Sequence, residues 1–317
     1  MTDATVVDFA PDMVSEVDAA RREYLNALLA SGILINSGVP GVYGKGQIFE
    51  RVLGAFDRFV IESGLDQNAE VFRFPPVISR ADFERSNYLK SFPHLTGTIH
   101  GFRGNERDQA DILRMVENGA DWTTHFHNTD LVLTPAACYP LYPMAAGVLP
   151  RNGRLFNVQS YCFRFEPSDD PARMQIFRQH EYVRIGTAEH VSRFRELWLA
   201  RSQVMLRAVG LDAQPEVAND PFFGRGGAML AASQKEQALK FEIVVPIGSA
   251  DALTAAVSCN YHQDHFGAAF GITTADGEVA HTACVGFGLE RITLALFKAH
   301  GLDVTQWPAA VRTTLGL

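Results

Sequence analysis

The feature that most limits the possible folds is a succession of strand-like segments in the second half of the chain. Helices are expected to interrupt these segments at residues 188–209 and 286–300, without a regular alternation of strand and helix. Strands that follow one another in this way are typical of an antiparallel sheet flanked by helices, the α+β class. The segments with strand character are 155–165, 175–185, 239–246, 253–259, 268–273 and 279–284.

The first half of the chain is expected to be mostly helical. Apolar residues recur at i, i+3 and i+4 between residues 48 and 60, which predicts an amphipathic helix. Residues 105–119 predict another helix, with Ile112, Leu113 and Val116 turned inward. The other expected elements are helices at 14–30 and 80–90 and a strand at 71–78 that runs into Pro75 and Pro76.

Composition and charge set further limits. With 47% apolar and 20% charged residues, the chain of 317 residues resembles an ordinary soluble globular protein. A net charge of −8 argues against a surface that binds nucleic acid or an anionic membrane over its whole extent. No break in composition divides the chain, so we expect a single domain over residues 1–317, with N-terminal helices in 1–65 and a surface excursion at 212–234.

The cysteines and the N-terminus indicate the compartment. Four cysteines in a chain of this length do not form a disulfide framework. Residues 1–11 contain no basic residue and do not resemble a signal peptide. No apolar run approaches the roughly 18 residues that a membrane helix needs. We therefore expect a cytoplasmic protein with reduced thiols that does not enter a membrane.

A glycine-rich turn at residues 38–46 contains Lys45 and has to be compared with a phosphate-binding P-loop. That loop requires Ser or Thr after the lysine and a strand before the first glycine. Here Gly46 follows Lys45, and a helix precedes the turn. We therefore interpret the segment as a connection between two helices.

The most informative stretch, residues 161–182, predicts two strands joined by a loop of proline and polar residues. In strand alternation Arg164 and Glu166 share one face of the first strand, and Arg173 and Phe177 share one face of the second. A face with so many charged groups does not suit a core, so it is either solvated or a binding site. Arginine binds phosphate bidentately, and an aromatic ring beside arginines suits a nucleobase.

A second candidate lies near the C-terminus, where Gly-Phe-Gly-Leu-Glu-Arg at residues 286–291 opens a helix directly after a strand. Glycines let a ligand approach the backbone closely, and the N-terminus of a helix favours an anion. Taken alone, a purely structural turn explains this segment equally well.

Together these segments resemble the signature motifs of class II aminoacyl-tRNA synthetases. The hairpin at 164–177 resembles motif 2, the turn at 286–291 resembles motif 3, and the strand at 71–78 resembles motif 1. Residues 240–246 and 258–264 are similar to the active-site strands of seryl enzymes. The run Thr-Pro-Ala-Ala-Cys-Tyr-Pro that begins at Thr134 is similar to the zinc-dependent seryl-tRNA synthetases of methanogenic archaea. The resemblance covers nearly the whole chain and implies the class II catalytic fold.

The resemblance also narrows the family. The archaeal enzymes carry a large N-terminal tRNA-binding domain, whereas only about 70 residues precede the motif 1 strand here and are expected to form two ordinary helices. A core of this kind without a tRNA-binding domain resembles the bacterial amino acid:[carrier protein] ligases. That family activates a small amino acid with ATP and loads it on the phosphopantetheine thiol of a carrier protein. It implies a thioester-forming ligase that uses no tRNA and pairs as a homodimer through motif 1.

The resemblance further implies one zinc ion per subunit, held by Cys138, Glu181 and Cys284. Three protein ligands leave one coordination position open, and in this family the α-amino group of the substrate fills it. The pair His125 and His127 is an alternative set of metal ligands, which we interpret instead as surface or interface residues. The cysteines expected to pack within strands are Cys162 and Cys259.

By the same resemblance, three residues are expected to act directly in adenylation. Arg164 would hold the α-phosphate and the substrate carboxylate, and Glu166 would accept from the adenine amino group. Arg291 would hold the terminal phosphates together with Arg173. Phe177 would stack on adenine, and Glu242 is a possible ligand of the Mg²⁺ that accompanies ATP. The nucleotide pocket is expected to comprise Arg164, Glu166, Arg173, Met174, Phe177, Lys240, Ala255, Ala256, Val257, Ser258 and Arg291.

Three alternatives remain open at this point. A tRNA ligase of the seryl type would keep this chemistry and change the acceptor. A non-catalytic paralogue would only bind an amino acid or a partner, and a different zinc enzyme would have another fold. Glycine and alanine are equally compatible substrates, because one methylene in an apolar pocket is worth only about 1–3 kcal/mol. Arg195, Arg201 or Arg225 could supply the basic patch that an acidic carrier protein needs.

Overall fold

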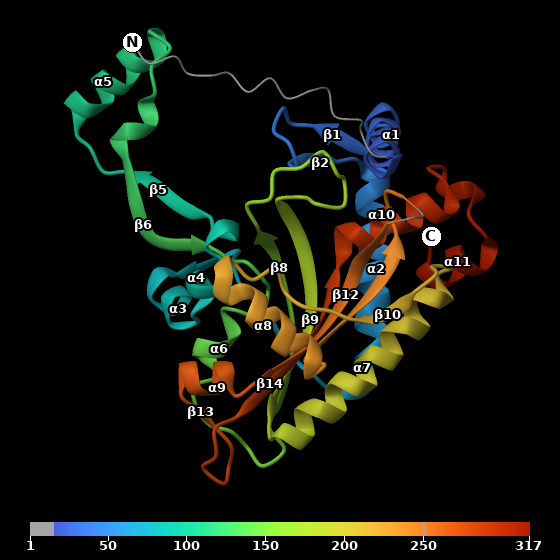
Figure 1. Cartoon of the computed structure of the whole chain (residues 1–317). Helices are drawn as coiled ribbons and strands as arrows, with labels where there is room; N and C mark the ends of the chain where they lie inside the picture. Colours follow the sequence, from blue (N-terminus) through green and yellow to red (C-terminus); the bar gives the residue numbers. More distant parts are fainter. Residues whose placement is uncertain (1–15, 250–251) are drawn as a thin grey trace.

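A sheet of seven strands forms the centre of the protein (Figure 1). The computed structural model describes residues 16–249 and 252–317. Neighbouring strands run antiparallel except β3 and β8, which are parallel, so the mainly antiparallel sheet predicted from the sequence is confirmed. In order across the sheet the strands are β10 (Gln214–Val217), β11 (Lys240–Pro246), β12 (Leu253–Gln263), β14 (His281–Gly288), β9 (Ile176–Gly186), β8 (Arg154–Phe163) and β3 (Glu70–Arg73).

Three helices cover one face of this sheet and enclose the larger core. They are α2 (Gln47–Ser63), α7 (Ala188–Ala208) and α10 (Leu289–His300). The apolar pattern predicted between residues 48 and 60 marks the buried side of α2, where Phe49 and Phe56 are fully buried. On α7, Trp198 is also fully buried and stacks on the ring of a β9 tyrosine, Tyr182.

The opposite face of the sheet carries a smaller core and the candidate site. Two short helices pack there, α6 (Leu141–Met144) and α9 (His265–Phe270). The rings of Tyr142 and Phe266 stack at 3.9 Å between these helices. Because side chains alternate along a strand, β9 directs Glu181 toward this face.

The N-terminal part of the described chain begins with α1 (Glu16–Ala30), which confirms the helix predicted at 14–30 from residue 16 onward. Residues 1–15 of the predicted N-terminal helical region lie outside the described residues. The glycine-rich turn is a small β-hairpin of β1 (Leu34–Asn36) and β2 (Tyr43–Lys45), and it connects α1 to α2. The amino group of Lys45 lies 3.6 Å from the carboxylate of Glu290.

A β-ribbon with a helical tip extends from the sheet and forms an arm, the upper left part of Figure 1. The helix predicted at 105–119 is present in it as α5 (Glu106–Glu117), but its apolar residues do not point inward. Leu113 and Val116 are 57% and 55% exposed, and no residue of α5 is buried. The other elements of the arm and its base are β4 (Val77–Ser79), α3 (Arg80–Arg85), α4 (Tyr88–Ser91), η2 (Pro93–Leu95), β5 (Thr98–Phe102), η3 (Trp122–His125) and β6 (Phe126–Leu133).

Two segments differ in detail from their predictions. The strand predicted at 268–273 is wrong, since this run begins inside α9 and ends in the two-residue strand β13 (Ile272–Thr273). Phe266 and Phe270 are both buried on α9 and are four residues apart, which is a helical spacing. The motif 1 strand is divided into β3 and β4, which belong to different sheets.

The segment at 212–234, predicted as a surface excursion, joins the edge of the main sheet through an exposed strand. It supplies β10 and most of α8 (Gly224–Glu236), which crosses in front of the sheet (Figure 1). The remaining elements are η1 (Leu65–Gln67), β7 (Gly147–Val148), η4 (Val304–Gln306) and α11 (Ala309–Leu315). Within the described ranges, none of the helices has the length and apolar character needed to cross a bilayer.

Candidate active site

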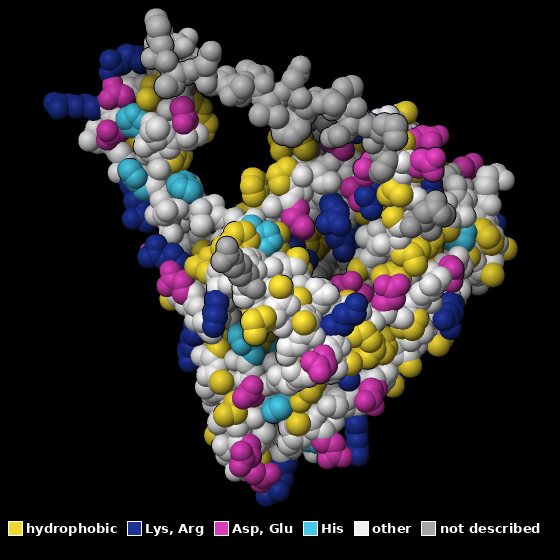
Figure 2. Space-filling view, in the orientation of Figure 1, with side chains coloured by type: hydrophobic (Ala, Val, Ile, Leu, Met, Phe, Trp, Pro, Cys, Tyr) yellow, Lys and Arg dark blue, Asp and Glu magenta, His cyan; other side chains and the backbone are white. Residues whose placement is uncertain are grey.

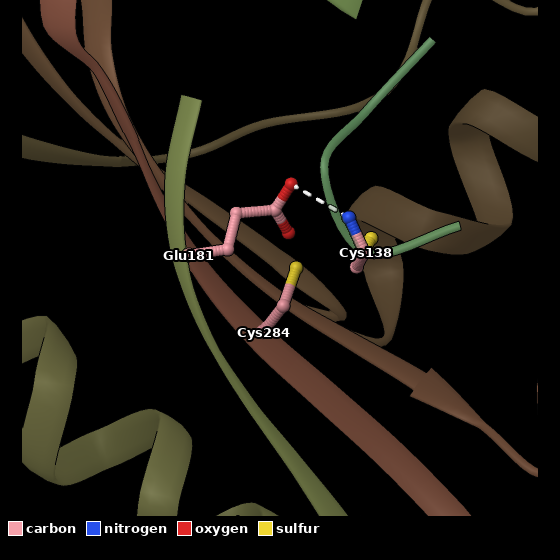
Figure 3. Close-up of side chains that lie close together, drawn as sticks. All are labelled: Cys138, Glu181 and Cys284. Atoms are coloured by element: carbon pink, nitrogen blue, oxygen red, sulfur yellow. Dashed lines mark hydrogen bonds between the residues drawn. The ribbon is translucent and has the colours of Figure 1, made fainter. Parts of the chain in front are cut away.

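Two cysteines and a glutamate meet beneath the smaller core (Figure 3). Cys138 comes from the loop before α6, Glu181 from β9 and Cys284 from β14, and the three side chains point toward one another. One ligand atom from each lies within 4.8 Å of the others, and all three residues are buried. Among the described residues, no other cluster of His, Cys, Asp and Glu has metal-ligand spacing. These are the residues that the sequence predicts as a metal site.

Strand pairing explains how residues so distant in sequence come together. In the register of β9 and β14, Glu181 is the partner of Gly286 and Cys284 is the partner of Val183. A Cβ atom at Gly286 would lie 3.4 Å from Cγ of Glu181, an ordinary van der Waals contact, so the two residues lie directly side by side. The backbone N–H of Cys138 donates to Oε1 of Glu181 at 3.3 Å and ties the loop to the strand.

The acid–base state of this cluster reflects its burial. Burial, followed by the charge of Cys284, raises the pKa of Glu181 to about 8. A hydrogen bond with Cys284 and burial raise the pKa of the Cys138 thiol, whereas the same hydrogen bond lowers the pKa of Cys284. The cluster therefore retains protons at neutral pH that a bound cation would displace. Two sulfurs and a carboxylate in a dry site fit a thiophilic divalent cation such as zinc.

Two adjoining cavities open on this face of the sheet, where Figure 2 shows a hollow lined by basic and acidic side chains. The larger has a volume of about 580 Å³ and contains the three residues of the Cys/Glu/Cys cluster in its wall. The smaller has a volume of about 70 Å³. The residues that line both cavities are Arg164, Gln179, Ser258 and Gly286.

Most of the predicted nucleotide residues line the smaller cavity. The guanidinium of Arg164 lies over the ring of Phe177 at 5.4 Å, and its Nε donates to the carbonyl of Pro135 at 3.2 Å. Arg291 is fixed by two donated hydrogen bonds to carbonyl oxygens, at 2.8 Å and 3.0 Å. Burial, together with the charges of Arg164 and Arg173, lowers the pKa of Arg291 to about 10. The predicted residues in this wall are Arg164, Glu166, Met174, Phe177, Ala255, Ala256, Ser258 and Arg291.

Three predicted nucleotide residues are not among those that line the two cavities. Arg173 precedes β9, is half exposed and lies 3.7 Å from Glu166. Val257 is buried in the core on the helical side. Lys240 is buried, and its amino group lies between Asp220 at 2.5 Å and a β11 carboxylate, Glu242, at 2.9 Å.

Two proteins of Bradyrhizobium diazoefficiens resemble the chain over most of its length. "Amino acid–[acyl-carrier-protein] ligase 2" is 50% identical over 291 residues, which cover 91% of this chain and 87% of that protein. "Amino acid–[acyl-carrier-protein] ligase 1" is 48% identical over 91% of this chain and 89% of that protein. The chain belongs to the amino acid–[acyl-carrier-protein] ligase family. No protein-family model matches it.

More distant likenesses define the fold of this ligase family member. The type-2 serine–tRNA ligase of Methanococcus aeolicus is 23% identical over 86% of this chain, which spans 56% of that protein. The seryl-tRNA synthetase of M. kandleri, solved with A. aeolicus tRNASec, superposes with a TM-score of 0.79 over 92% of this chain and 60% of that one, at 18% identity. The seryl-tRNA synthetase of Pyrococcus horikoshii complexed with ATP gives a TM-score of 0.67 at 16% identity, over 94% of this chain and 62% of that one. The chain therefore has the class II synthetase catalytic fold, as the sequence predicts.

Several residues in the walls of the site had no predicted role. Gln179 lines both cavities, and strand parity could have placed it, since it lies between Phe177 and Glu181 on the same side of β9. Asn260 and His262 of β12 line the larger cavity near Cys284. Their run resembles an active-site strand of seryl enzymes, but that resemblance assigned no role to either side chain.

The other cysteines and histidines stay apart from the metal-ligand cluster. Cys162 is buried on the same face and its thiol donates to Oε1 of Gln179 at 3.2 Å, whereas Cys259 lies in the core on the helical side. His125 is half-buried and His127 is exposed, both on the arm. His180 lies beside Glu181 in β9 but faces the helices, and its Nδ1 lies 2.6 Å from a carboxylate oxygen of Asp57.

The arginines considered for carrier-protein docking make local contacts. Arg195 donates to the carbonyl of Ala238 at 2.8 Å. Arg201 forms an ion pair with Asp66 at 2.6 Å. Arg225 lies in α8, and its side chain is outside the described residues.

Proposed function

We propose that the protein activates glycine or alanine with ATP as an aminoacyl-adenylate and transfers the aminoacyl group to the phosphopantetheine thiol of an acyl carrier protein. The observation that carries this proposal is the pair of adjoining cavities, one with the Cys/Glu/Cys cluster and one with the arginines, with Arg164 in the wall of both. The names of the two Bradyrhizobium relatives support a carrier protein as the acceptor.

The amino acid would bind with its amino group at the cluster and its carboxylate at Arg164. Zinc is the metal we propose for Cys138, Glu181 and Cys284, and when bound it would offer an open coordination position to the neutral α-amino group. Arg164 lines both cavities and can therefore reach a carboxylate held between them. This arrangement recognises the two groups common to all α-amino acids.

The first chemical step would be adenylation. A carboxylate oxygen of the amino acid attacks the α-phosphorus of ATP, and the bond to the β-phosphate oxygen breaks to release pyrophosphate. Arg164 and Arg291 would neutralise charge on the phosphates, and Phe177 would stack on adenine beside Glu166. Glu242 lines the same cavity and is our candidate ligand for Mg²⁺.

The second step would be attack of the carrier's thiol on the carbonyl carbon of the adenylate. The C–S bond forms, the C–O bond to phosphate breaks, and AMP leaves with the electron pair. All cysteines of the chain are buried, so the nucleophile is assigned to the partner. The larger cavity, at about 580 Å³, has room for a pantetheine arm beside a small amino acid.

Aromatic side chains support a substrate with an uncharged side chain. Tyr88, Tyr139 and Phe266 line the larger cavity close to the cluster, and the rings of Tyr139 and Phe266 are in edge contact at 5.6 Å. These rings form an apolar wall with no charged group to pair with a charged substrate side chain.

We further propose a cytoplasmic homodimer with one catalytic domain per subunit, paired through the motif 1 strand. β3 is the last strand at its edge of the sheet, and Val71 on it is 66% exposed. An edge strand with free backbone groups and an apolar side chain favours pairing with another chain.

The test is amino-acid-dependent ATP–pyrophosphate exchange with glycine, alanine and serine, followed by transfer to a carrier protein. We expect exchange with glycine or alanine, and a thioester on the carrier that carries the phosphopantetheine arm. The same carrier without the arm is the matched control and should stay unloaded. Exchange with serine and charging of tRNA would instead favour the seryl alternative, and no exchange by zinc-loaded protein would favour a binding paralogue.

A further inference from the structure

The sulfur of Cys284 has two nitrogen neighbours that are not metal ligands in the proposed set. Nδ2 of Asn260 lies 3.4 Å from the sulfur, and Nε2 of His262 lies 3.7 Å from it. Both side chains come from β12, which pairs with β14, and Asn260 is the register partner of Cys284. Both residues are half-buried and line the larger cavity.

The direction of these hydrogen bonds follows from the chemistry of a metal-bound cysteine. A cysteine that binds a metal is a thiolate and has no proton to donate. The Asn260 amide and Nε2 of His262 must then be the donors. Charge-assisted hydrogen bonds of this kind are about twice as strong as neutral ones.

A third residue contacts the other ring nitrogen of His262. Oγ1 of Thr282 lies 3.0 Å from Nδ1 of the ring, and Thr282 is fully buried. If Nε2 carries the proton of a neutral ring, Nδ1 accepts a hydrogen bond from the hydroxyl of Thr282, which can donate. Each hydrogen bond from Thr282 to His262 and from His262 to Cys284 then has one donor and one acceptor.

We propose that Asn260 and His262 are positioning residues of the metal centre, which hold the Cys284 thiolate in place by donating hydrogen bonds to its sulfur. This inference rests on the metal site of the proposed function. The donors stabilise the negative charge of a thiolate whose residue is buried. They also withdraw electron density from the sulfur. A bound cation would then be a stronger Lewis acid toward the amino group of the substrate. Partners that orient metal ligands typically affect metal affinity by about 10- to 100-fold.

The experiment measures zinc affinity by competition with a chelator, and the absorption spectrum of the cobalt-loaded protein. The variants are Asn260→Leu and His262→Leu, which remove one donor each at similar volume. His262→Gln keeps an N–H near the position of Nε2 and should retain most of the affinity. His281→Gln is the matched control, since this neighbouring ring contacts the hydroxyl of Tyr261 at 2.6 Å.

We expect zinc affinity to fall about 10- to 100-fold in each leucine variant, and the sulfur-to-cobalt charge-transfer band to move to longer wavelength. The band reports on the sulfur itself, so a general loss of packing would not shift it in this direction. Thr282→Val should give a smaller shift of the same sign.

Two results would overturn the inference, and they are distinguishable. Wild-type affinity and an unshifted band in both leucine variants would show that the donors do not act on the sulfur, while the metal site stands. If the unmodified protein binds neither zinc nor cobalt, the metal site of the proposed function fails and the inference fails with it.

Discussion

Glu290 accepts two hydrogen bonds from Arg178, one from the backbone nitrogen at 2.6 Å and one from Nε at 2.9 Å. Both residues are sequence neighbours of proposed nucleotide-site residues: Glu290 of Arg291, and Arg178 of Phe177. The pair therefore fixes the start of α10 to β9 at the smaller cavity, which Glu290 lines. Arg178 also forms a bidentate pair with Glu50 of α2 at 2.7 Å and 2.8 Å.

We predict that Glu290→Ala destabilises the protein strongly and raises the KM for ATP. Glu290 is 2% exposed, and its loss removes two charge-assisted hydrogen bonds from Arg178, each worth about 1.5–3 kcal/mol, although Arg178 keeps its pair with Glu50. The control is Glu50→Gln, whose side chain is 45% exposed and whose loss should cost at most about 1 kcal/mol. Urea unfolding measures both, and equal costs would contradict a special role for Glu290.

Replacing Phe177 should weaken ATP binding without affecting metal binding. Stacking of a base on an aromatic ring is worth about 1–3 kcal/mol, so Phe177→Leu should raise the dissociation constant for ATP by about 5- to 150-fold. Phe165→Leu is the matched control, because Phe165 is 56% exposed and is absent from both cavity walls. Titration with ATP measures the effect. Equal ATP affinity in the two variants would contradict the stacking of adenine on Phe177.

Two of the thiols on the site face, Cys138 and Cys162, should behave differently toward zinc. Cys138→Ser removes a proposed ligand and should abolish stoichiometric binding, whereas Cys162→Ser should retain it, since Cys162 contacts Gln179 and lies outside the cluster. Zinc content after dialysis, measured by mass spectrometry, distinguishes them. Full zinc occupancy in Cys138→Ser would point to another ligand set.

Metal binding should release protons and strengthen as pH rises toward about 8. The pKa of Glu181 is raised to about 8 by burial and by the charge of Cys284, so in the metal-free protein at pH 7 most molecules hold a proton there. A cation must displace that proton, which is why its affinity increases with pH below the pKa. Calorimetric titration in buffers of different ionisation enthalpy counts the protons. Binding with no proton release between pH 6 and 8 would sink this account.

Local sequence patterns predict the individual strands and helices of this structure, but they do not predict the contacts between distant segments. Alternation and the polar loop predict the hairpin of β8 and β9, because both signals lie within one short stretch. The cluster of Cys138, Glu181 and Cys284 depends on the register between β9 and β14 and on a separate loop. No spacing rule encodes such a register, so the resemblance to a known family was the sole indication of these ligands.

Two predicted nucleotide residues lie outside the cavity walls, and local patterns could not have shown this, because parity and periodicity hold only within an element. Arg173 shares parity with Phe177, but β9 begins at Ile176, and the backbone before it does not alternate like a strand. Lys240 was expected to line the pocket, and its amino group pairs with Asp220, which belongs to the segment at 212–234 that was predicted as a surface excursion. Ion pairs between such distant segments leave no local signal.

The arm illustrates the same limit and gives the last prediction. The apolar side of α5 was correctly located along the helix, but periodicity shows which residues share a side and does not show what covers them. Leu113 is 57% exposed, whereas Leu53 of α2 is 3% exposed. Leu53→Ala should therefore cost about 2–5 kcal/mol, and Leu113→Ala should change stability by no more than about 0.5 kcal/mol. Both are measured by urea unfolding at several protein concentrations. A larger cost at Leu113 that grows with concentration would show that a second copy covers α5 in solution.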